Sequence, residues 1–245
     1  MEFGLSKQHQ LLQQMYKEFA EKEIKPFAAE VDETEEFPRK NVDKMVKAGF
    51  MGIPFAKEYG GEGGDTLGYI MAVEELSKVC ATTGVILSAH TSLGTYPIEH
   101  FGTEQQKQKY LKDLASGKKL GAFGLTEPNA GTDASMQQTM AVKQGDKYIL
   151  NGSKVFITNG GEADTYVVFA MTDKSKGTKG ISAFIVEKGT KGFSFGPHEK
   201  KMGIRGSATC ELIYEDVEVP QENLLGQEGK GFKIAMNTID VRRIG

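Results

Sequence analysis

The sequence predicts an α+β protein of more than one domain. In this prediction a helical N-terminal domain precedes a small β-barrel or β-sandwich, and the first helix of a C-terminal helical bundle follows. Apolar residues recur at helical spacing as far as Lys119, whereas short β-rich runs separated by Gly, Lys and Ser turns begin at Leu120. Helical spacing returns after Pro220. We therefore place the domains at residues 1–119, 120–228 and 229–245.

Composition restricts the class of protein. The chain has 245 residues, of which 39% are hydrophobic, enough for one to two domains with a real core. A net charge of −3 and the lack of a basic patch argue against a nucleic-acid partner. The sequence shows no signal-peptide apolar region and no membrane-spanning run, so we expect a soluble cytoplasmic protein without a membrane partner. Cys80 and Cys210 match no metal-binding motif, and we expect reduced thiols and no metal.

The N-terminal part begins with two predicted helices. Apolar residues at helical spacing continue as far as Pro26, and the pattern resumes after Pro38, a residue suited to a first helical turn. The run GGEGG at residues 60–64 then breaks the pattern and predicts a flexible segment.

Three further helical segments are predicted before the β-rich part. Asp65 can cap a helix that carries apolar residues on one face. Residues 81–95 are rich in small side chains, which predicts a buried helix with close neighbours. Thr103 begins the last of these helices, and Gly117 ends it.

The middle part reads as short strands. Residues 144–147 have the composition of a hairpin turn between two of them. The predicted strands are 121–125, 139–143, 148–158, 165–171, 181–186 and 211–219. Many short strands at hairpin spacing favour a barrel or a sandwich. The final helical pattern stops at Gly245 without a closing signal, so we expect the sequence to end inside a helix whose packing partners lie outside it.

Common catalytic and nucleotide-binding signatures are absent from the sequence. We find no GxGxxG after a strand, no GxxxxGK[ST], no GxSxG and no HExxH. GQEGKGF at 226–232 has the wrong glycine spacing, and a mobile entry to the last helix is its simpler interpretation. His9, His90, His100 and His198 are interpreted as packing or surface residues.

The stretch TEPNAGTDAS, from Thr126 to Ser135, combines a turn composition with several hydroxyl groups. Backbone N–H groups of such a loop can converge on an anionic or carbonyl oxygen, and Thr126, Thr132 and Ser135 add donors without charge. These groups suit the pyrimidine end of a flavin. An ordinary turn between strands is the alternative.

A second stretch, KVFITNGG at 154–161, favours the flavin interpretation. Strand alternation places Phe156 and Thr158 on one face, with Val155 and Ile157 on the other. An aromatic ring and a hydroxyl on one face can stack on a planar ring and hydrogen-bond its edge. Taken alone, Phe156 is interpreted as a core residue.

Together these stretches resemble the acyl-CoA dehydrogenase family. The matching runs are FGLTEPNAGTDAS, LNGSKVFITNGG, KMGIRGSATCEL, YEDVEVP, LLGQEGKGFKIAM and, less closely, DVRRIG. The resemblance extends over essentially the whole chain, in order, and is strongest to the bacterial short-chain, butyryl-CoA type. It implies a helical N-terminal domain, a middle β-domain and a C-terminal helical bundle, the same order as the residue patterns predict.

The resemblance implies an FAD site built from two segments. The first, around TEPNAGT, assigns Phe123, Leu125, Thr126, Gly131 and Thr132 to the cofactor. Thr126 matches a hydroxyl position beside the flavin ring, and Thr132 matches a position that also touches the acyl-CoA.

The second segment matches at Phe156, Ile157 and Thr158, with Thr158 near the N5 edge of the ring. Many relatives have tryptophan where this chain has Phe156, which can still stack but cannot donate a hydrogen bond. Asp240 and Arg243 match a D-x-x-R element near the CoA moiety. The pair between them is Val241–Arg242, where small residues are usual in the family, and bulky side chains there could obstruct the ligand.

The reaction implied by the resemblance is α,β-dehydrogenation of a short-chain acyl-CoA to the 2-enoyl-CoA. Electrons would pass to an electron-transferring flavoprotein, and the intact family forms homo-oligomers, commonly homotetramers. In short-chain relatives the base that removes the α proton is a glutamate far beyond position 245. We therefore assign no catalytic residue and expect the sequence as given to lack the base.

Two alternatives remain open from the sequence. The chain could be a non-catalytic domain pair that binds flavin and acyl-CoA or serves as an interaction scaffold. An acyl-CoA oxidase shares much of the family pattern and would form peroxide under air. Bleaching of a yellow protein by butyryl-CoA distinguishes the dehydrogenase from the scaffold.

Overall fold

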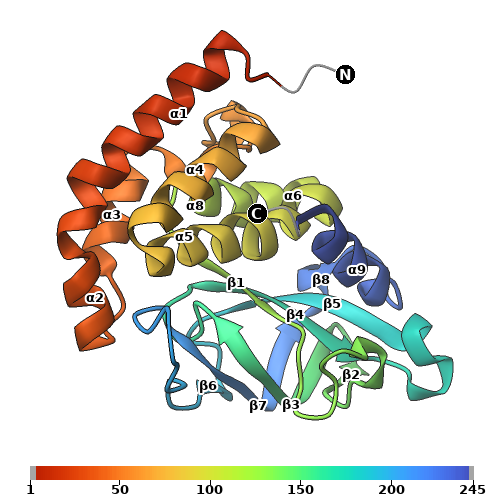
Figure 1. Cartoon of the computed structure of the whole chain (residues 1–245). Coiled ribbons are helices and arrows are strands. Elements are labelled where there is room, and N and C mark those ends of the chain that lie inside the picture. The colour runs from red at the N-terminus through yellow and green to blue at the C-terminus, as the bar shows by residue number, and fades with distance from the viewer. Residues whose placement is uncertain (1–3, 243–245) are drawn as a thin grey trace.

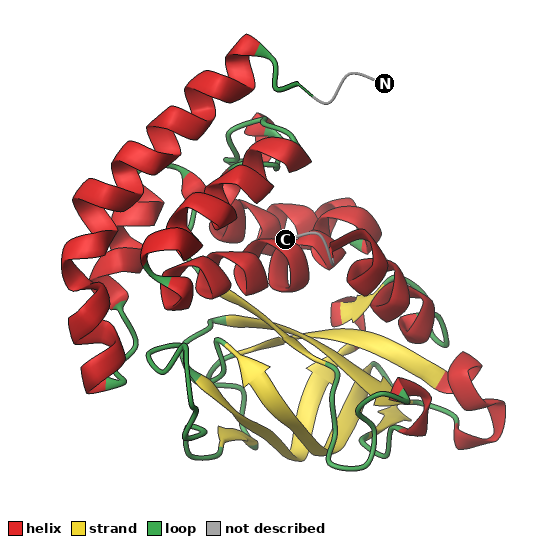
Figure 2. Cartoon of the chain, in the orientation of Figure 1, coloured by secondary structure: helices red, strands yellow, loops and turns green. Residues whose placement is uncertain are grey.

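The computed structural model describes residues 4–242 and places a layer of helices against one side of a twisted β-sheet (Figures 1 and 2). The helices before the sheet are α1 (Lys7–Phe19), α2 (Ala28–Thr34), α3 (Arg39–Lys47), α4 (Thr66–Val79), α5 (Ala81–Ser88), α6 (Tyr96–Phe101), α7 (Glu104–Gln106) and α8 (Lys112–Ala115). Two π-helical turns, η5 (Ala89–Thr95) and η6 (Lys107–Leu111), join α5 to α6 and α7 to α8. The predicted helical N-terminal part is confirmed.

The predicted helix boundaries rest on side-chain caps that the structure contains. Asp65 accepts a hydrogen bond from the backbone N of Gly68 at 2.8 Å and so begins α4. Thr103 and Gln106 form a reciprocal capping box at α7. Gly117 has a φ of 74°, a left-handed conformation that ends α8 at little cost because glycine has no Cβ.

The sheet contains strands of both relative directions. Its members are β1 (Gly121–Gly124), β2 (Met140–Gln144), β3 (Lys147–Thr158), β4 (Thr165–Met171), β5 (Ile181–Glu187), β6 (Phe193–Phe195), β7 (Thr209–Pro220) and β8 (Leu224–Leu225). The order is β6-β7-β3-β2-β4-β5-β8, with β1 pairing to β4 beside this path. β4 runs parallel to β1 and β2, and the remaining pairs are antiparallel.

The sheet is mixed and open among the described residues, so the predicted barrel is not confirmed. Its two end strands, β6 and β8, have no pairing with one another. Both are only two or three residues long, too short for the alternation rule to detect, and neither was predicted. The β2–β3 hairpin is confirmed with a tighter turn than expected, because Gln144 pairs with Lys147 and only Gly145 and Asp146 lie between them.

The helical layer meets the sheet where η5 crosses β1. A Cβ on Gly94 of η5 would lie 2.5 Å from the backbone carbon of Gly121, so the two backbones touch here. The Nδ1 of His90, which is fully buried, accepts a hydrogen bond from the backbone N of Gly121 at 3.0 Å. The predicted buried helix with close neighbours is therefore confirmed at residues 81–95.

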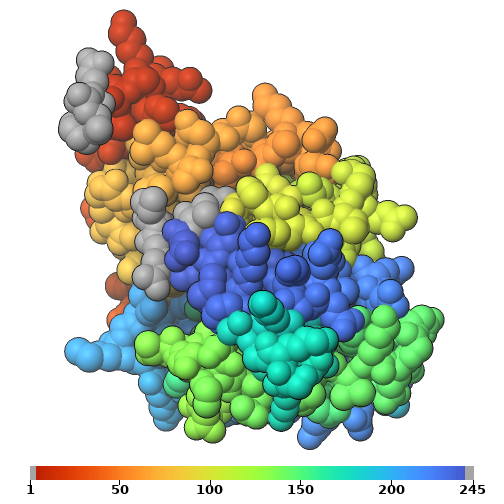
Figure 3. Space-filling model, turned by 90° about the vertical axis from the view of Figure 1, so that its right-hand side faces the viewer, coloured from red at the N-terminus to blue at the C-terminus, as the bar shows by residue number. Residues whose placement is uncertain are grey.

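The last helix, α9 (Gly231–Arg242), is packed inside this arrangement. Figure 3 shows it, in blue, between the helical layer and the β-rich part. Ile234 and Ala235 are buried, and Tyr96 donates a hydrogen bond from its hydroxyl to Oδ1 of Asn237 at 3.1 Å. The expectation that this helix has no packing partners in the chain is wrong for these residues, because α6, η5 and β5 supply them.

None of the helices among residues 4–242 combines the length and the apolar character that crossing a bilayer requires. Cys80 and Cys210 are free and buried.

Candidate functional site

Six of the residues assigned to the cofactor from the sequence line one cavity. The cavity has a volume of about 210 Å³ and lies where β1, β3, η5 and α9 meet. The lining residues are Ala89, Leu93, Phe123, Leu125, Thr126, Phe156, Ile157, Thr158 and Ile239. The two motifs are thus brought together although about thirty residues separate them along the chain. We call this cavity the candidate site.

The other predicted site residues lie outside the lining. Gly131 and Thr132 are exposed on the loop that leaves Thr126. Asp240 is exposed on α9, next to the lining residue Ile239. Arg243 lies outside the described residues, and its role stays a prediction.

The loop from 126 to 135 contains both a turn and a wall of the candidate site. Glu127 and Ala130 exchange backbone hydrogen bonds of 3.2 and 3.1 Å around Pro128 and Asn129, which makes a tight turn. Ser135 donates its hydroxyl to Asp133 within the loop, so it is not the free donor that the sequence suggested. Only the start of the loop, at Thr126, reaches the cavity.

The end of β3 departs from strand alternation. The pairing of β3 with β7 shifts register between Lys154 and Ile157, and Phe156 adopts a φ of 59° within this β-bulge. Phe156, Ile157 and Thr158 therefore all line the candidate site. Ile157 is buried in the hydrophobic core, whereas Phe156 is exposed and Thr158 is half-buried, so burial still differs between Ile157 and its two neighbours across the bulge.

Phe156 is also not a core residue, since 64% of its surface is exposed. A left-handed backbone costs a residue with a Cβ roughly 1–2 kcal/mol, and a side chain this exposed returns little burial energy. Strain of this kind is concentrated at binding sites. The bulge turns an aromatic ring toward the cavity at a cost in stability.

We expect Phe156→Gly to raise the free energy of unfolding by about 0.5–1 kcal/mol. Relief of strain contributes roughly 1–2 kcal/mol, while the greater freedom of glycine in the unfolded chain costs roughly 0.5–1 kcal/mol. Urea unfolding measures the difference. Phe156→Ala is the control, because it removes the ring and keeps the strain. A glycine variant that is less stable than the alanine variant would show that the φ of 59° carries no strain.

The hydroxyl groups of the candidate site are available to a ligand. The side chains of Thr126 and Thr158 line the cavity, and neither makes a side-chain hydrogen bond to any residue in the part of the chain that is described. Each hydroxyl can both donate and accept. Beside the exposed ring of Phe156, this set fits a flat molecule with polar edge atoms.

Beneath the loop lies a buried ion pair that the sequence interpretation missed. Lys154 Nζ and Glu127 Oε1 are 2.7 Å apart, and the side chains are 0% and 5% exposed. Both residues stand inside the two motifs, but only their neighbours were assigned roles. The signal was the position of Lys154, which shares the inward phase of β3 with Tyr148 and Leu150. A lysine on the buried face of a strand requires a partner.

The charges of this pair are maintained at neutral pH. Burial lowers the pKa of Lys154 to about 8, and the charge of Glu127 opposes a larger shift. Burial alone would raise the pKa of Glu127, but Lys154 and two backbone N–H donors outweigh it and hold that pKa below its ordinary value. At neutral pH both groups are therefore ionised.

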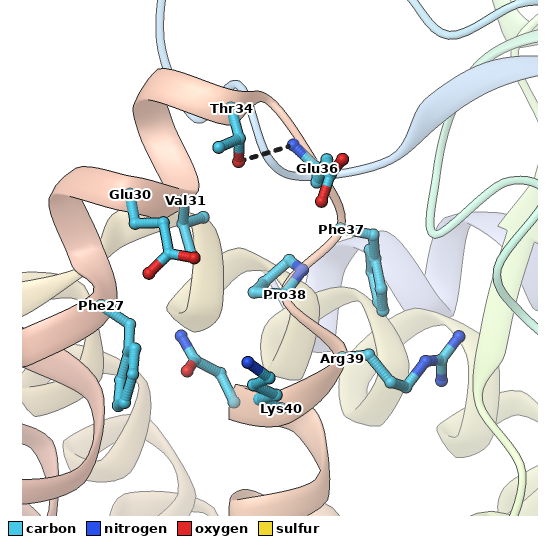
Figure 4. A pocket seen from close by; sticks show the side chains of 10 residues that line it. Phe27, Glu30, Val31, Thr34, Glu36, Phe37, Pro38, Arg39 and Lys40 are labelled. Carbon is cyan, nitrogen blue, oxygen red and sulfur yellow. Dashed lines mark hydrogen bonds between the residues drawn. The ribbon is translucent and has the colours of Figure 1, made fainter.

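A second cavity, of about 250 Å³, lies on the helical layer between α2 and α3 (Figure 4). It is lined by residues from Phe27 to Asn41, and the Thr34 hydroxyl there accepts a hydrogen bond from the backbone N of Glu36. It shares no residue with the candidate site, and no motif of the sequence maps to it. Convergence of two motifs favours the smaller cavity as the functional one.

Residues 4–242 contain no group of three or more His, Cys, Asp or Glu side chains that could hold a metal ion. The polar atoms of the candidate site are hydroxyl and backbone groups, which suit an organic ligand.

Comparison with known proteins identifies the family of this chain. Residues 6–118 match the family model "Acyl-CoA dehydrogenase, N-terminal domain", and residues 122–217 match "Acyl-CoA dehydrogenase, middle domain". The chain is 67% identical to a short-chain-specific acyl-CoA dehydrogenase of Clostridium acetobutylicum over 245 residues, which is 100% of this chain and 65% of that protein.

Two solved structures extend the comparison. Butyryl-CoA dehydrogenase from Megasphaera elsdenii matches with a TM-score of 0.96 and 55% identity, over 99% of this chain and 64% of that one. An acyl-CoA dehydrogenase from Bacillus anthracis, complexed with FAD, matches with a TM-score of 0.90 and 40% identity, over 98% of this chain and 41% of that one. This sequence spans about 65% of the length of the curated relative from C. acetobutylicum. The chain belongs to the acyl-CoA dehydrogenase family.

Proposed function

We propose that this chain supplies the helical and middle domains of an FAD-dependent acyl-CoA dehydrogenase that acts on short-chain, butyryl-CoA-like thioesters. The observation that carries the proposal is the candidate site, where Thr126 and Phe156–Thr158 meet around one cavity. Bound FAD would supply the electron acceptor for α,β-dehydrogenation to the 2-enoyl-CoA. The domains are proposed at 1–119, 120–228 and 229–245.

In this proposal the hydroxyls of Thr126 and Thr158 hydrogen-bond the edge of the flavin ring, and Phe156 packs on it. Phe123, Leu125 and Ile157 exclude water from the cavity, since Leu125 and Ile157 are buried. Removal of water strengthens hydrogen bonds from fixed donors to a ring that gains negative charge. Gly131 and Thr132 lie on the same loop, where Thr132 would face the acyl-CoA.

The volume of the cavity limits how much of a ligand the described residues can enclose. Its volume of about 210 Å³ is below the roughly 300–1,000 Å³ of typical ligand pockets, so the described residues enclose only part of an FAD molecule. We propose that Asp240 and Arg243 lie near the CoA moiety. We also propose an electron-transferring flavoprotein as the electron acceptor, a homo-oligomeric assembly, specifically a homotetramer, and a cytoplasmic location. These proposals rest on the family resemblance.

We expect Thr158→Val to weaken FAD binding about fivefold, because the change removes one hydroxyl hydrogen bond, worth about 1 kcal/mol, and keeps the shape of the side chain. FAD is titrated with the longest form of the protein that its coding sequence allows. The quenching of flavin fluorescence measures the affinity. Thr34→Val is the matched control, since Thr34 is exposed on α2 and remote from the candidate site.

Equal affinities of the Thr158 variant and the unmodified protein would remove Thr158 from the site. A protein that binds no FAD and is not bleached by butyryl-CoA would contradict the proposed activity and favour the non-catalytic alternative.

A further inference from the structure

The two halves of the candidate site come from segments that are separate in the chain. Thr126 follows β1, and Phe156, Ile157 and Thr158 end β3. Their backbones are joined directly by a hydrogen bond from the N of Val155 to the O of Thr126, 2.8 Å long. Any ligand that touches both Thr126 and Thr158 depends on this separation staying constant.

The ammonium group of Lys154 ties the first half to the second. Its Nζ donates to the backbone O of Leu125 at 3.2 Å, to Oε1 of Glu127 at 2.7 Å and to Oε1 of Gln137 at 3.0 Å. An ammonium has three donors, so every one has an acceptor. Leu125 and Glu127 stand on either side of Thr126. Lys154 therefore holds the chain immediately before and after the residue whose hydroxyl reaches the cavity.

The carboxylate of Glu127 fixes the far end of the same loop. Its Oε2 accepts from the backbone N of Gln138 at 2.6 Å, and its Oε1 accepts from that of Thr139 at 3.1 Å. The carboxylate thus closes the segment between Glu127 and Thr139, which contains Gly131 and Thr132. The Lys154 ammonium and the Glu127 carboxylate therefore bind backbone and side-chain groups of the loop as well as each other.

Stability alone does not explain a charged pair at this position. Desolvation of two buried charges offsets most of their attraction, and apolar residues of the same volume are often as stable. What an apolar pair cannot do is hold a carbonyl, two N–H groups and an amide oxygen at fixed positions, because it has no directional bonds. The arrangement favours geometric specificity over stability.

We propose that Glu127 and Lys154 are positioning residues of the candidate site, which hold Thr126 and the 127–139 loop in register with Phe156–Thr158 so that both halves meet one ligand. The identity of that ligand as a flavin rests on the proposed function. The positioning role of Glu127 and Lys154 does not rest on the proposed function, because their contacts are all within this chain.

The test is the double variant Glu127→Gln/Lys154→Met, which removes both charges, keeps the length of the first side chain and shortens the second by one atom. Hydrogen exchange at the amides of Gln138 and Thr139, without added ligand, reports the loop. FAD affinity and the visible absorption spectrum of bound FAD report the site. We expect exchange at the two amides to be at least tenfold faster, FAD affinity to fall about tenfold, and the spectrum to shift toward that of free flavin.

Tyr110→Phe is the control for a loss of buried polar contacts in general. The Tyr110 hydroxyl is hydrogen-bonded to Asn223 and Glu187 between the helical layer and the sheet, and Tyr110 does not line the candidate site. It should leave exchange at Gln138 and Thr139 and the FAD spectrum unchanged. If the double variant does not fold, Glu127→Asp replaces it, since it keeps the charge and withdraws the carboxylate by one methylene.

Three outcomes overturn or separate the proposals. Unchanged amide exchange in the double or the Asp variant refutes the positioning role. So does a Tyr110→Phe protein that loses FAD affinity to the same degree, because the effect is then general. Faster exchange in the variant of a protein that binds no FAD even when unmodified supports the positioning role and refutes the proposed function.

Discussion

Gly94→Ala is expected to lower the free energy of unfolding by about 3 kcal/mol, at the upper end of the usual cost of overpacking a core. The added Cβ would lie 2.5 Å from the carbonyl carbon of Gly121 and 2.7 Å from the N of Ala122. These are backbone atoms of β1, which no side-chain rotation can move. The variant therefore has to separate η5 from β1 or distort one of them.

The same displacement should reach the candidate site. Ala89 and Leu93 of η5 and Phe123 of β1 are walls of the cavity, so moving η5 away from β1 widens it. Urea unfolding measures the stability, and FAD titration measures the site. Gly203→Ala is the matched control, because a Cβ there meets no atom within 4 Å. A Gly94 variant as stable as the Gly203 variant would show that the η5–β1 contact tolerates a methyl group.

Acid is expected to destabilise the protein through His90. Complete burial lowers the pKa of this imidazole from 6.5 to about 4, and nearby backbone carbonyls of Leu114 and Met51 offset only part of the shift. Nδ1 accepts from the N of Gly121, so a proton on Nδ1 also breaks that hydrogen bond. The His90 imidazole therefore stays neutral in the folded protein at a pH where the same imidazole is already protonated in the unfolded chain.

The sign follows from proton binding. Between pH 6.5 and about 4 the unfolded state binds more protons at this site, so stability falls as the pH falls through this window. The loss reaches about 3 kcal/mol at pH 4, from about 1.4 kcal/mol for each pKa unit. Above pH 6.5 the contribution of His90 to pH dependence vanishes.

Urea unfolding between pH 4 and pH 8 measures this dependence. His90→Asn places an amide oxygen near the position of Nδ1 and does not titrate, so its stability should vary about 3 kcal/mol less over the range. His198→Asn, at an exposed histidine, is the control and should keep the acid sensitivity of the unmodified protein. Equal pH profiles of the two variants would show that His90 is protonated at no cost.

The parts of the fold that sequence reasoning predicted depend on local chemistry. Asp65 and Thr103 begin helices because their side chains satisfy N–H groups three residues away. The β2–β3 hairpin follows from a glycine in a short polar turn between two apolar runs. Such signals lie within a few residues of the structure that they determine. The structure contains the predicted caps and the hairpin almost as predicted.

The features that the sequence did not reveal depend on distant partners. Lys154 and Glu127 are 27 residues apart, and nothing in either motif shows which of its polar residues is buried. The bulge at Phe156 arises where β3 meets β7, so strand alternation alone could not predict it. The open sheet is likewise a property of pairing among all strands, because the local pattern of a barrel and of an open sheet is the same.

The candidate site was predicted as two motifs and found as one cavity. Residue chemistry suggested Thr126, Phe156 and Thr158, the family resemblance assigned them and Ile157 to the cofactor, and the structure places all four around one cavity. It added Ala89, Leu93 and Ile239, which no motif marked because their role is only to form walls. Apolar wall residues have no chemical signature that distinguishes them from the core.

Because α9 packs between the helical layer and the sheet, its contacts can form only late in translation. Tyr96 and its hydrogen-bond partner Asn237 are 141 residues apart in the sequence. At about 5–20 residues per second, the ribosome takes roughly 7–28 s to synthesise the chain between them. During that time the faces of α6 and η5 that finally contact α9 are exposed on the nascent chain. The contacts of α9 with α6 and η5 are therefore among the last to form during synthesis.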